Sequence, residues 1–395
     1  MANHGEAVGA ERTARIALLV LQPTPFCNIS CDYCYLPNRS DPHRLDDVTL
    51  RAALQFVIDS QLLGDDLTIV WHAGEPLVVG PAFYEKAFAT VAEVMPAHAS
   101  VRHAFQTNGL LLDARWCELF REHDVRLGLS IDGPQLLHDA RRKTRSGGGT
   151  FIEAMRGLDL VKRAGLDFHL ISVLTHETLR APEALFDFYV ENAVRHVAFN
   201  IEEVEGVHTS SSLQTDDTEH SYRRFLTCFL TLMADAHWPF TLRELDAACG
   251  AILRRPESPR NAQTDPWTIV SIDSRGEIGT FSPELLGQHS QEYGTFSLGN
   301  VLSSNFKQVS RSLRFLAMAD AVKLGVESCR ASCHYFSLCG GGAPANKFAE
   351  HQSLSATETM FCRLTQQVTL DVVMDLLETA MLAPHQTPIA SATPS

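Results

Sequence analysis

The sequence predicts an α/β protein: a partial six-stranded parallel barrel, then a helical bridge and a cysteine-rich C-terminal domain. Two observations predict the barrel. Six apolar runs of strand length alternate with amphipathic stretches of helix length, a pattern typical of βα units in one parallel sheet. A polar segment follows each apolar run. Six units are fewer than the eight of a closed barrel, so we expect an open one.

The expected strands are the six apolar runs at 15–21, 67–72, 101–107, 125–131, 167–173 and 194–200. The expected helices lie between them, at 48–63, 81–94, 113–123, 150–164 and 181–192. In parallel barrels the catalytic loops collect at the carboxyl ends of the strands. We therefore expect the six polar segments to form one site.

The second half of the chain has different patterns. Apolar residues three and four apart predict helices over 215–254, a hairpin is expected within 266–299, and a last helix over 365–382. The predicted domains are therefore a barrel, a bridge and a cluster domain, at 15–214, 215–264 and 265–382. The ends, 1–14 and 383–395, are expected to be disordered tails.

Composition excludes several classes of protein. Of the 395 residues, 45% are hydrophobic and 20% charged, which is too apolar for a disordered chain. No apolar run approaches the ~20 residues of a membrane-spanning helix, and the N-terminus has no signal core, so we expect a cytoplasmic protein without membrane insertion. The net charge of -14 gives no reason to expect nucleic-acid binding. The ten cysteines are expected to be ligands or free thiols rather than disulfides.

Three cysteines follow the first expected strand. Cys27, Cys31 and Cys34 have the spacing C-x3-C-x2-C, and three thiolates leave one iron of a 4Fe-4S cluster without a protein ligand. S-adenosylmethionine can chelate that iron, and one electron then splits it into methionine and a 5′-deoxyadenosyl radical. This spacing, with Tyr33 before the third cysteine, resembles the radical S-adenosylmethionine (SAM) superfamily. A structural zinc loop is the alternative.

Other strand ends carry the same resemblance. The stretch from His72 to Pro76 is similar to the family's GGEP turn, whose carbonyl groups receive the ammonium group of SAM. Asn108 lies in a family-like third strand end, and the fourth resembles the segment that contacts the carboxylate or ribose of SAM. Each residue could instead belong to a tight turn or make a structural hydrogen bond. The resemblance implies the cofactor-binding residues Tyr33, His72, Ala73, Gly74, Glu75, Asn108, Ser130 and Asp132.

A second set of thiols lies near the C-terminus. Cys329, Cys333, Cys339 and Cys362 are enough for a closed 4Fe-4S cluster or for tetrahedral zinc, and glycines at 340–342 could donate N–H groups to sulfur. The segment resembles the SPASM domain of peptide-modifying radical enzymes, with C-x3-C in place of C-x2-C.

The departures from a full SPASM domain imply fewer clusters. Phe281 and Ala343 stand where the inner auxiliary cluster would have cysteines. The resemblance therefore implies two 4Fe-4S clusters, one that binds SAM and one auxiliary. Cys117, Cys228 and Cys249 fall in helical patterns and are expected to be buried packing residues.

The paired domains imply an enzyme that modifies a ribosomally made precursor peptide. A one-electron donor such as flavodoxin or ferredoxin would supply electrons to the enzyme. The stretches CNISCDYCYLPNRS, FNIEEVEG, TFSPELLG and CGGGAPANK resemble maturases that form cyclophanes in glycine-rich-repeat peptides. By analogy, loss of a β-hydrogen would lead to a carbon–carbon crosslink to an aromatic ring. The alternatives are oxidation of a Ser or Cys, as in sulfatase maturases, and a zinc-stabilised peptide-binding protein.

The base of such a reaction is not fixed by sequence. Related sulfatase maturases have an Asp where this chain has Ser282. Glu284 is the first candidate, followed by Glu202, Glu203 and Asp273; for each, the alternative is a solvated or salt-bridged carboxylate. Glu202 and Glu203 could also bind peptide amides or an arginine. A basic run, Arg141, Arg142, Lys143 and Arg145, is expected to be a solvated loop or a contact for an acidic leader peptide.

Overall fold

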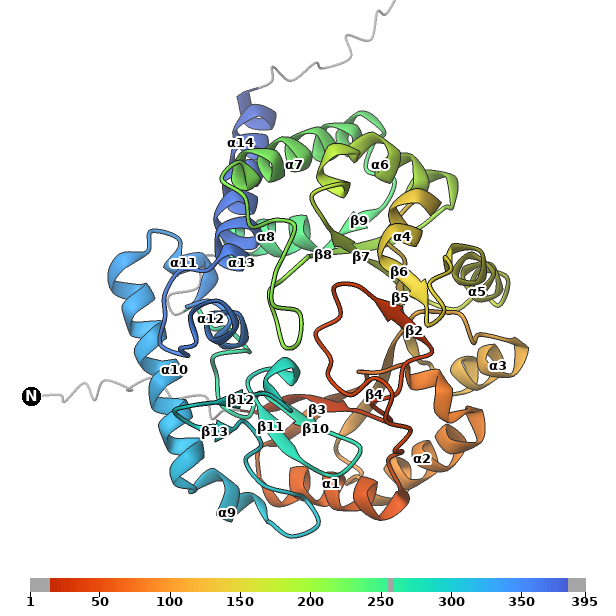
Figure 1. Ribbon diagram of the computed structural model, residues 1–395, viewed down its shortest axis with the longest axis vertical. Coiled ribbons are helices and arrows are strands. Elements are labelled where there is room, and N and C mark those ends of the chain that lie inside the picture. Colours follow the sequence, from red (N-terminus) through yellow and green to blue (C-terminus); the bar gives the residue numbers. More distant parts are fainter. Residues whose placement is uncertain (1–14, 255–258, 383–395) are drawn as a thin grey trace, which may run out of the picture.

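The computed structural model describes residues 15–254 and 259–382, so the tails predicted at 1–14 and 383–395 lie outside the described residues. Its main feature is a nine-stranded sheet in the order β11-β10-β1-β3-β4-β5-β7-β8-β9. Every neighbouring pair is parallel except β10 and β11. Figure 1 shows the strands arranged in an arc with helices outside it. The sheet is open, as predicted.

All six predicted strands are confirmed: β1 (Ile16–Leu21), β3 (Leu63–Trp71), β4 (Ser100–Thr107), β5 (Arg126–Ser130), β7 (Phe168–Leu174) and β8 (His196–Ile201). The five predicted helices are also present, as α1 (Asp47–Asp59), α2 (Pro81–Val94), α3 (Ala114–Glu122), α5 (Phe151–Arg163) and α6 (Pro182–Glu191). Short elements lie between them: β2 (Ile29–Cys31), η1 (Pro76–Val79), α4 (Gln135–Arg141), β6 (Arg142–Thr144) and η2 (Thr178–Arg180).

The bridge is not wholly helical, which corrects the prediction. Between α7 (Thr218–Asp235) and α8 (Arg243–Arg254) lies β9 (Thr241–Leu242), which pairs with β8. The predicted hairpin is confirmed as β10 (Ile269–Ile272) and β11 (Ile278–Thr280), but β10 also pairs in parallel with β1. Both additions cover edges of the six-stranded sheet, whose unpaired backbone groups need partners. The sheet thus crosses the predicted boundary at residue 265.

The C-terminal elements are short apart from two long helices. After η3 (Pro283–Leu285), β12 (His289–Ser290), β13 (Gly294–Thr295) and α9 (Phe306–Ser310) comes the long helix α10 (Leu313–Ser332). It is followed by α11 (Phe336–Cys339), α12 (Pro344–His351), α13 (Met360–Cys362) and the π-helical turn η4 (Arg363–Val368). The last helix, α14 (Thr369–Leu382), lies beside α7 and α8 (Figure 1). Within the described chain, no helix has both the length and the apolar character to cross a membrane.

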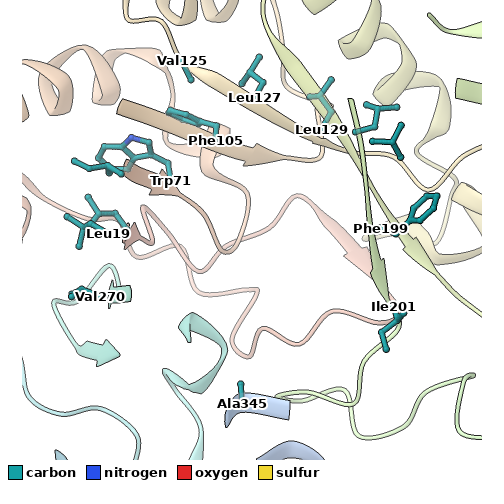
Figure 2. Packing of buried hydrophobic residues seen from close by; sticks show 14 of the residues in the cluster. Leu19, Trp71, Phe105, Val125, Leu127, Leu129, Phe199, Ile201, Val270 and Ala345 are labelled. Atoms are coloured by element: carbon teal, nitrogen blue, oxygen red, sulfur yellow. The ribbon is translucent and has the colours of Figure 1, made fainter. Parts of the chain in front are cut away.

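The core lies along the strands. Leu19, Trp71, Phe105, Leu127 and Phe199 are buried side chains of β1, β3, β4, β5 and β8 (Figure 2). Buried apolar side chains recur along each of these strands, which is why the runs could be recognised in the sequence.

The prediction of buried thiols is confirmed in part. Cys117 is buried, whereas Cys228 and Cys249 are only half-buried on the bridge helices. All the cysteines are free thiols. The spacing of apolar residues shows which face of a helix packs inward, but it does not separate the centre of that face from its partly exposed edges. This is why the burial of Cys228 and Cys249 was overestimated.

Candidate active site

The carboxyl ends of the strands surround a cavity of about 660 Å³. The loop with Cys27, Cys31 and Cys34 lines it, together with residues at or near the ends of β3, β4, β5 and β8. Glu284, Asn346 and other residues from the C-terminal half complete the wall. Four of the six predicted polar segments therefore meet here. The segments after β5, Asp132 to Pro134, and after β7, Thr175 to Glu177, do not line the cavity, although Ser130 and Val173 of those strands do.

The cysteine loop is fixed by hydrogen bonds to its backbone. Arg145 Nη1 donates to the Cys27 carbonyl oxygen at 2.8 Å, and Arg39 Nη1 donates to that of Cys31 at 3.1 Å. β2 in this loop also pairs with β6. The three thiols are thus presented to the cavity from one braced loop.

The chemistry around these thiols suits an iron–sulfur cluster. Asn108 Nδ2 lies 4.0 Å from Cys27 Sγ, and Arg142 Nη1 lies 3.9 Å from Cys31 Sγ. Donors and positive charge near sulfur stabilise the thiolates of such a cluster. Burial, the largest cause, raises the pKa of Cys27 to about 12 and that of Cys31 to about 11. Cluster binding must therefore displace these thiol protons.

Arg142 of the basic run is part of this site, which corrects the prediction of a solvated loop for that residue, whereas Arg145 is exposed as predicted. Arg142 is buried and makes two hydrogen bonds of 3.0 Å to the Asp132 carboxylate. Tyr33 donates to the same carboxylate at 2.5 Å, and the backbone N–H of Val173 does so at 3.0 Å. Asp132 is fully engaged and does not line the cavity. It orients Arg142 and Tyr33 behind the cysteines.

The turn after β3 packs directly on the cysteine loop. Gly74 has a φ of +65°, and a Cβ there would lie 2.3 Å from the Thr24 carbonyl oxygen, so only glycine fits. Glu75 accepts hydrogen bonds from Thr107 and from the backbone N–H groups of Leu77 and Asn108. Its buried carboxylate therefore joins the ends of β3 and β4.

The other predicted cofactor residues divide between the cavity wall and its surroundings. His72 and Ser130 line the cavity, whereas Ala73 lies against a smaller neighbouring one. His72 Nε2 is 3.2 Å from the Tyr35 hydroxyl. Burial lowers the pKa of His72 to about 4, so this imidazole is neutral at physiological pH.

Three glutamates, Glu203, Glu205 and Glu284, meet in the wall of the cavity. Glu203 accepts a hydrogen bond from Asn346 Nδ2, and Ser282 donates to Glu284. Burial raises the pKa of all three carboxyl groups, that of Glu203 to about 7. Acidic neighbours further raise the pKa values of Glu203 and Glu205. Sequence reasoning missed Glu205, although it lies in the same strand-end segment as Glu203.

The other two candidate bases, Glu202 and Asp273, are bound by other groups. Glu202 lines the cavity, but its carboxylate accepts hydrogen bonds from the backbone and hydroxyl of Ser212, and His208 Nε2 is 3.5 Å away. Asp273 accepts from the backbone N–H groups of Arg275 and Glu277 in the β10–β11 turn, outside this cavity. Only Glu203 and Glu284 of the four candidates are brought together.

The second set of cysteines lies around the ends of α10, α11 and α13. Lys347 Nζ is 3.5 Å from Cys329 Sγ, and Gln367 Nε2 is 3.6 Å from Cys362 Sγ. Lys347 is only 2% exposed. A buried cation next to a thiol suits an anionic cluster, because an unpaired buried charge would be costly.

The glycine loop also reaches these thiols, as predicted. Backbone N–H groups of Gly341 and Gly342 bond to Cys339 and lower the pKa of its thiol, while burial, the larger effect, raises it. Phe281 and Ala343, which replace cysteines of a full SPASM domain, are both buried in the core. Their side chains take part in apolar packing.

Comparison with known proteins places these features in a family. The Radical SAM superfamily matches residues 21–189. An uncharacterised protein of Synechocystis is 39% identical over 368 residues, 92% of each chain. A serine-type anaerobic sulfatase-maturating enzyme of Klebsiella aerogenes is 37% identical over 177 residues, which cover 44% of each chain.

Solved structures share the fold. The anaerobic sulfatase-maturating enzyme anSMEcpe with bound AdoMet and Cp18Cys peptide matches with a TM-score of 0.75 and 20% identity, over 92% of this chain and 98% of that one. Streptococcus suis SuiB bound to its precursor peptide SuiA matches with a TM-score of 0.61 and 17% identity, over 88% and 76%. The three-cysteine loop at the strand ends, the family match and the shared fold lead to one conclusion: the chain belongs to the radical SAM superfamily.

Proposed function

We propose that this enzyme removes two hydrogens from one residue of a bound peptide or protein segment. The observation that carries the proposal is that the three-cysteine loop and Glu203, Glu205 and Glu284 line the same cavity. Its volume of about 660 Å³ is in the range of ligand sites. The likeness to sulfatase-maturating enzymes, and the peptides bound to two of the similar structures, support a peptide or protein substrate.

Each part of the cavity has a role in this proposal. Cys27, Cys31 and Cys34 would bind one 4Fe-4S cluster, and the Gly74 turn would contact SAM. When bound, this pair supplies the 5′-deoxyadenosyl radical that takes a hydrogen atom from the substrate. Glu284 would accept the proton that leaves next, since its pKa is raised by burial and Ser282 orients its carboxylate.

One electron remains to be removed from the substrate. Cys329, Cys333, Cys339 and Cys362 would bind an auxiliary 4Fe-4S cluster as its acceptor, with Lys347 next to the sulfur of Cys329. The substrate then loses a hydrogen atom, a proton and an electron, which equals two hydrogens. A one-electron donor such as flavodoxin or ferredoxin would supply the electron that starts the reaction.

The comparisons support oxidation of a Ser or Cys side chain better than the crosslink that the sequence resemblance favoured. The named relatives are serine- and cysteine-type sulfatase-maturating enzymes. Carbon–carbon crosslinking is a second candidate for a specific reason: Phe281 and Ala343 replace cysteines of a full SPASM domain, and Ser282 replaces the Asp that the resemblance assigns to sulfatase maturases. A zinc-stabilised binding protein without redox activity has no support from the family.

Coexpression with the small open reading frames beside its gene tests the proposal. Tandem mass spectrometry of each peptide is expected to show a loss of two hydrogens with wild type and none with Cys34→Ala. A loss confined to one Ser or Cys supports side-chain oxidation. A loss that blocks fragmentation between an aromatic residue and a neighbour supports crosslinking. Peptides modified equally by the Cys34→Ala enzyme would contradict the proposal.

A further inference from the structure

The acidic wall of the cavity, formed by Glu203, Glu205 and Glu284, has more carboxyl groups than the proposed oxidation uses. We propose that Glu205 and Glu203 form a subsite for a positively charged side chain, arginine or lysine, of the substrate. The inference rests on the proposed function in that the occupant belongs to a peptide or protein. It adds the chemical class of a residue that this substrate must carry.

Acidic side chains outnumber basic ones around the cavity. Six glutamates and two arginines line it. Both arginines have carboxylate partners: Arg142 pairs with Asp132, and Arg243 pairs with Glu244 at 2.6 Å. Within residues 15–254 and 259–382, no further cation lines the wall near Glu203, Glu205 and Glu284.

The remaining glutamates of the wall are satisfied by donors. Glu75 accepts three hydrogen bonds and Glu202 accepts from Ser212. The second oxygen of Glu244 accepts from the backbone N–H of Phe199 at 3.0 Å. These carboxylates are therefore occupied by hydrogen bonds within the protein and are not free to bind a ligand.

Glu205 is the exception. It is only 9% exposed, it lines the cavity, and no described residue donates a hydrogen bond to its carboxylate. Its backbone is fixed, because its N–H donates to the His208 carbonyl oxygen at 2.8 Å and the His208 N–H donates back at 2.9 Å. A buried carboxylate without a partner is costly, so a ligand that supplies a positive charge here would stabilise the ionised form of Glu205.

The adjacent Gly206 holds this carboxylate beside the cysteine loop. A Cβ at Gly206 would lie 2.1 Å from the Tyr35 carbonyl oxygen, and the Val207 N–H donates to that oxygen at 3.1 Å. Tyr35 follows Cys34 directly. A side chain bound by Glu205 would therefore lie next to the place where hydrogen abstraction is proposed, and its residue would be close in the peptide to the residue that is modified.

An organic cation fits better than other ligands. In the described part of the chain, no three His, Cys, Asp or Glu side chains lie close enough together to hold a single metal ion. A peptide N–H group would supply a hydrogen bond but no charge. Arginine or lysine supplies both, and apolar residues that line the same cavity, such as Leu338 and Phe361, can pack against its aliphatic stem.

Two small probes of the same shape test the charge requirement. N-acetyl-arginine methylamide and N-acetyl-citrulline methylamide differ in charge but have similar size and hydrogen-bonding groups. Their dissociation constants are measured by saturation-transfer NMR on the anaerobic enzyme with both clusters and SAM present. We expect wild type to bind the arginine probe about tenfold more tightly than the citrulline probe.

Glutamine variants locate the effect. The preference for arginine is expected to fall below about threefold in Glu205→Gln and in Glu203→Gln, and to persist in Glu191→Gln, an exposed glutamate at the end of α6. Circular dichroism verifies that each variant is folded. Equal binding of the two probes by wild type would overturn the inference, as would a preference that survives both site variants.

Failure of this inference can be distinguished from failure of the proposed function. Probe binding needs no radical chemistry, whereas oxidation is read by mass spectrometry of coexpressed peptides. Peptides that lose two hydrogens without any preference for arginine in the probe assay would contradict the cationic subsite alone. A charge preference that depends on Glu205, in an enzyme that oxidises none of the peptides, would contradict the proposed function alone.

Discussion

Arg142 shows how one residue joins the fold to the site. It is buried, pairs twice with Asp132 and lies 3.9 Å from Cys31 Sγ. Its neighbour Arg141 pairs with Glu177 near the surface. Two adjacent arginines in one sequence run therefore have different environments, a difference that the sequence pattern alone cannot reveal.

The two arginines make a matched pair of variants. Arg142→Leu is expected to lower the free energy of unfolding by about 3 kcal/mol, because Asp132 would be left buried without its partner. Arg141→Leu is expected to cost less than about 1 kcal/mol, since its ion pair is partly solvated. Urea unfolding of the cluster-free protein, followed by circular dichroism, measures both. Equal losses would contradict the buried pair.

Lys347 is expected to tune the auxiliary cluster. Its ammonium group lies 3.5 Å from Cys329 Sγ and is buried, and positive charge near cluster sulfur raises the reduction potential. Lys347→Met should therefore shift the midpoint potential of that cluster to more negative values in an EPR-monitored redox titration.

An exposed lysine of α10 provides the control for that variant. Lys323→Met, which removes the partner of Glu327 on the surface, should leave the potential unchanged. An unchanged potential in Lys347→Met, with a full complement of iron, would show that the lysine has no electrostatic role at the cluster.

At the scale of elements, the strand-end loops depend on close backbone contacts. The segment after β8 packs on the cysteine loop through Gly206, where no side chain fits against Tyr35. The turn after β3 packs on the same loop through Gly74. These two contacts set the position of the acidic wall and of the proposed SAM site relative to the cysteines.

Gly206→Ala tests the first of these contacts. Both Gly206 and Gly147 have positive φ, so alanine costs about 1 kcal/mol of backbone strain at either position. At Gly147 nothing lies within 4 Å of the new Cβ, whereas at Gly206 it would meet the Tyr35 carbonyl oxygen at 2.1 Å. We expect Gly206→Ala, but not Gly147→Ala, to lose iron. Gly206→Ala should also unfold at a clearly lower temperature than Gly147→Ala. Identical iron content and melting temperatures in the two variants would contradict this.

Element positions were largely predictable from the sequence, but pairings and contacts were not. The strands from β1 to β8 that carry apolar runs could be recognised because each contributes several apolar side chains to the core. The parallel pairing of β10 with β1 joins segments about 250 residues apart, and no local pattern encodes it. Glu205 was overlooked for a similar reason, because its lack of a partner depends on side chains from distant segments.

At the scale of the whole molecule, two cysteine sets lie in separate parts of the chain, one at the strand ends and one around α10, α11 and α13. If each binds a 4Fe-4S cluster, the anaerobically reconstituted enzyme contains about eight irons per chain. Cys34→Ala and Cys339→Ala should each retain about four. A wild-type content near four, or loss of all iron in Cys34→Ala, would contradict two independent clusters.

We propose that the loop of Cys27, Cys31 and Cys34 directs radical cleavage of SAM. The most direct measurement is the formation of 5′-deoxyadenosine by the reconstituted, dithionite-reduced enzyme, followed by liquid chromatography. Wild type is expected to form it, Ala variants of these three cysteines to form none, and Cys339→Ala to retain part of the activity. No 5′-deoxyadenosine from an iron-replete wild type, or undiminished formation in the Cys34→Ala variant, would contradict the account.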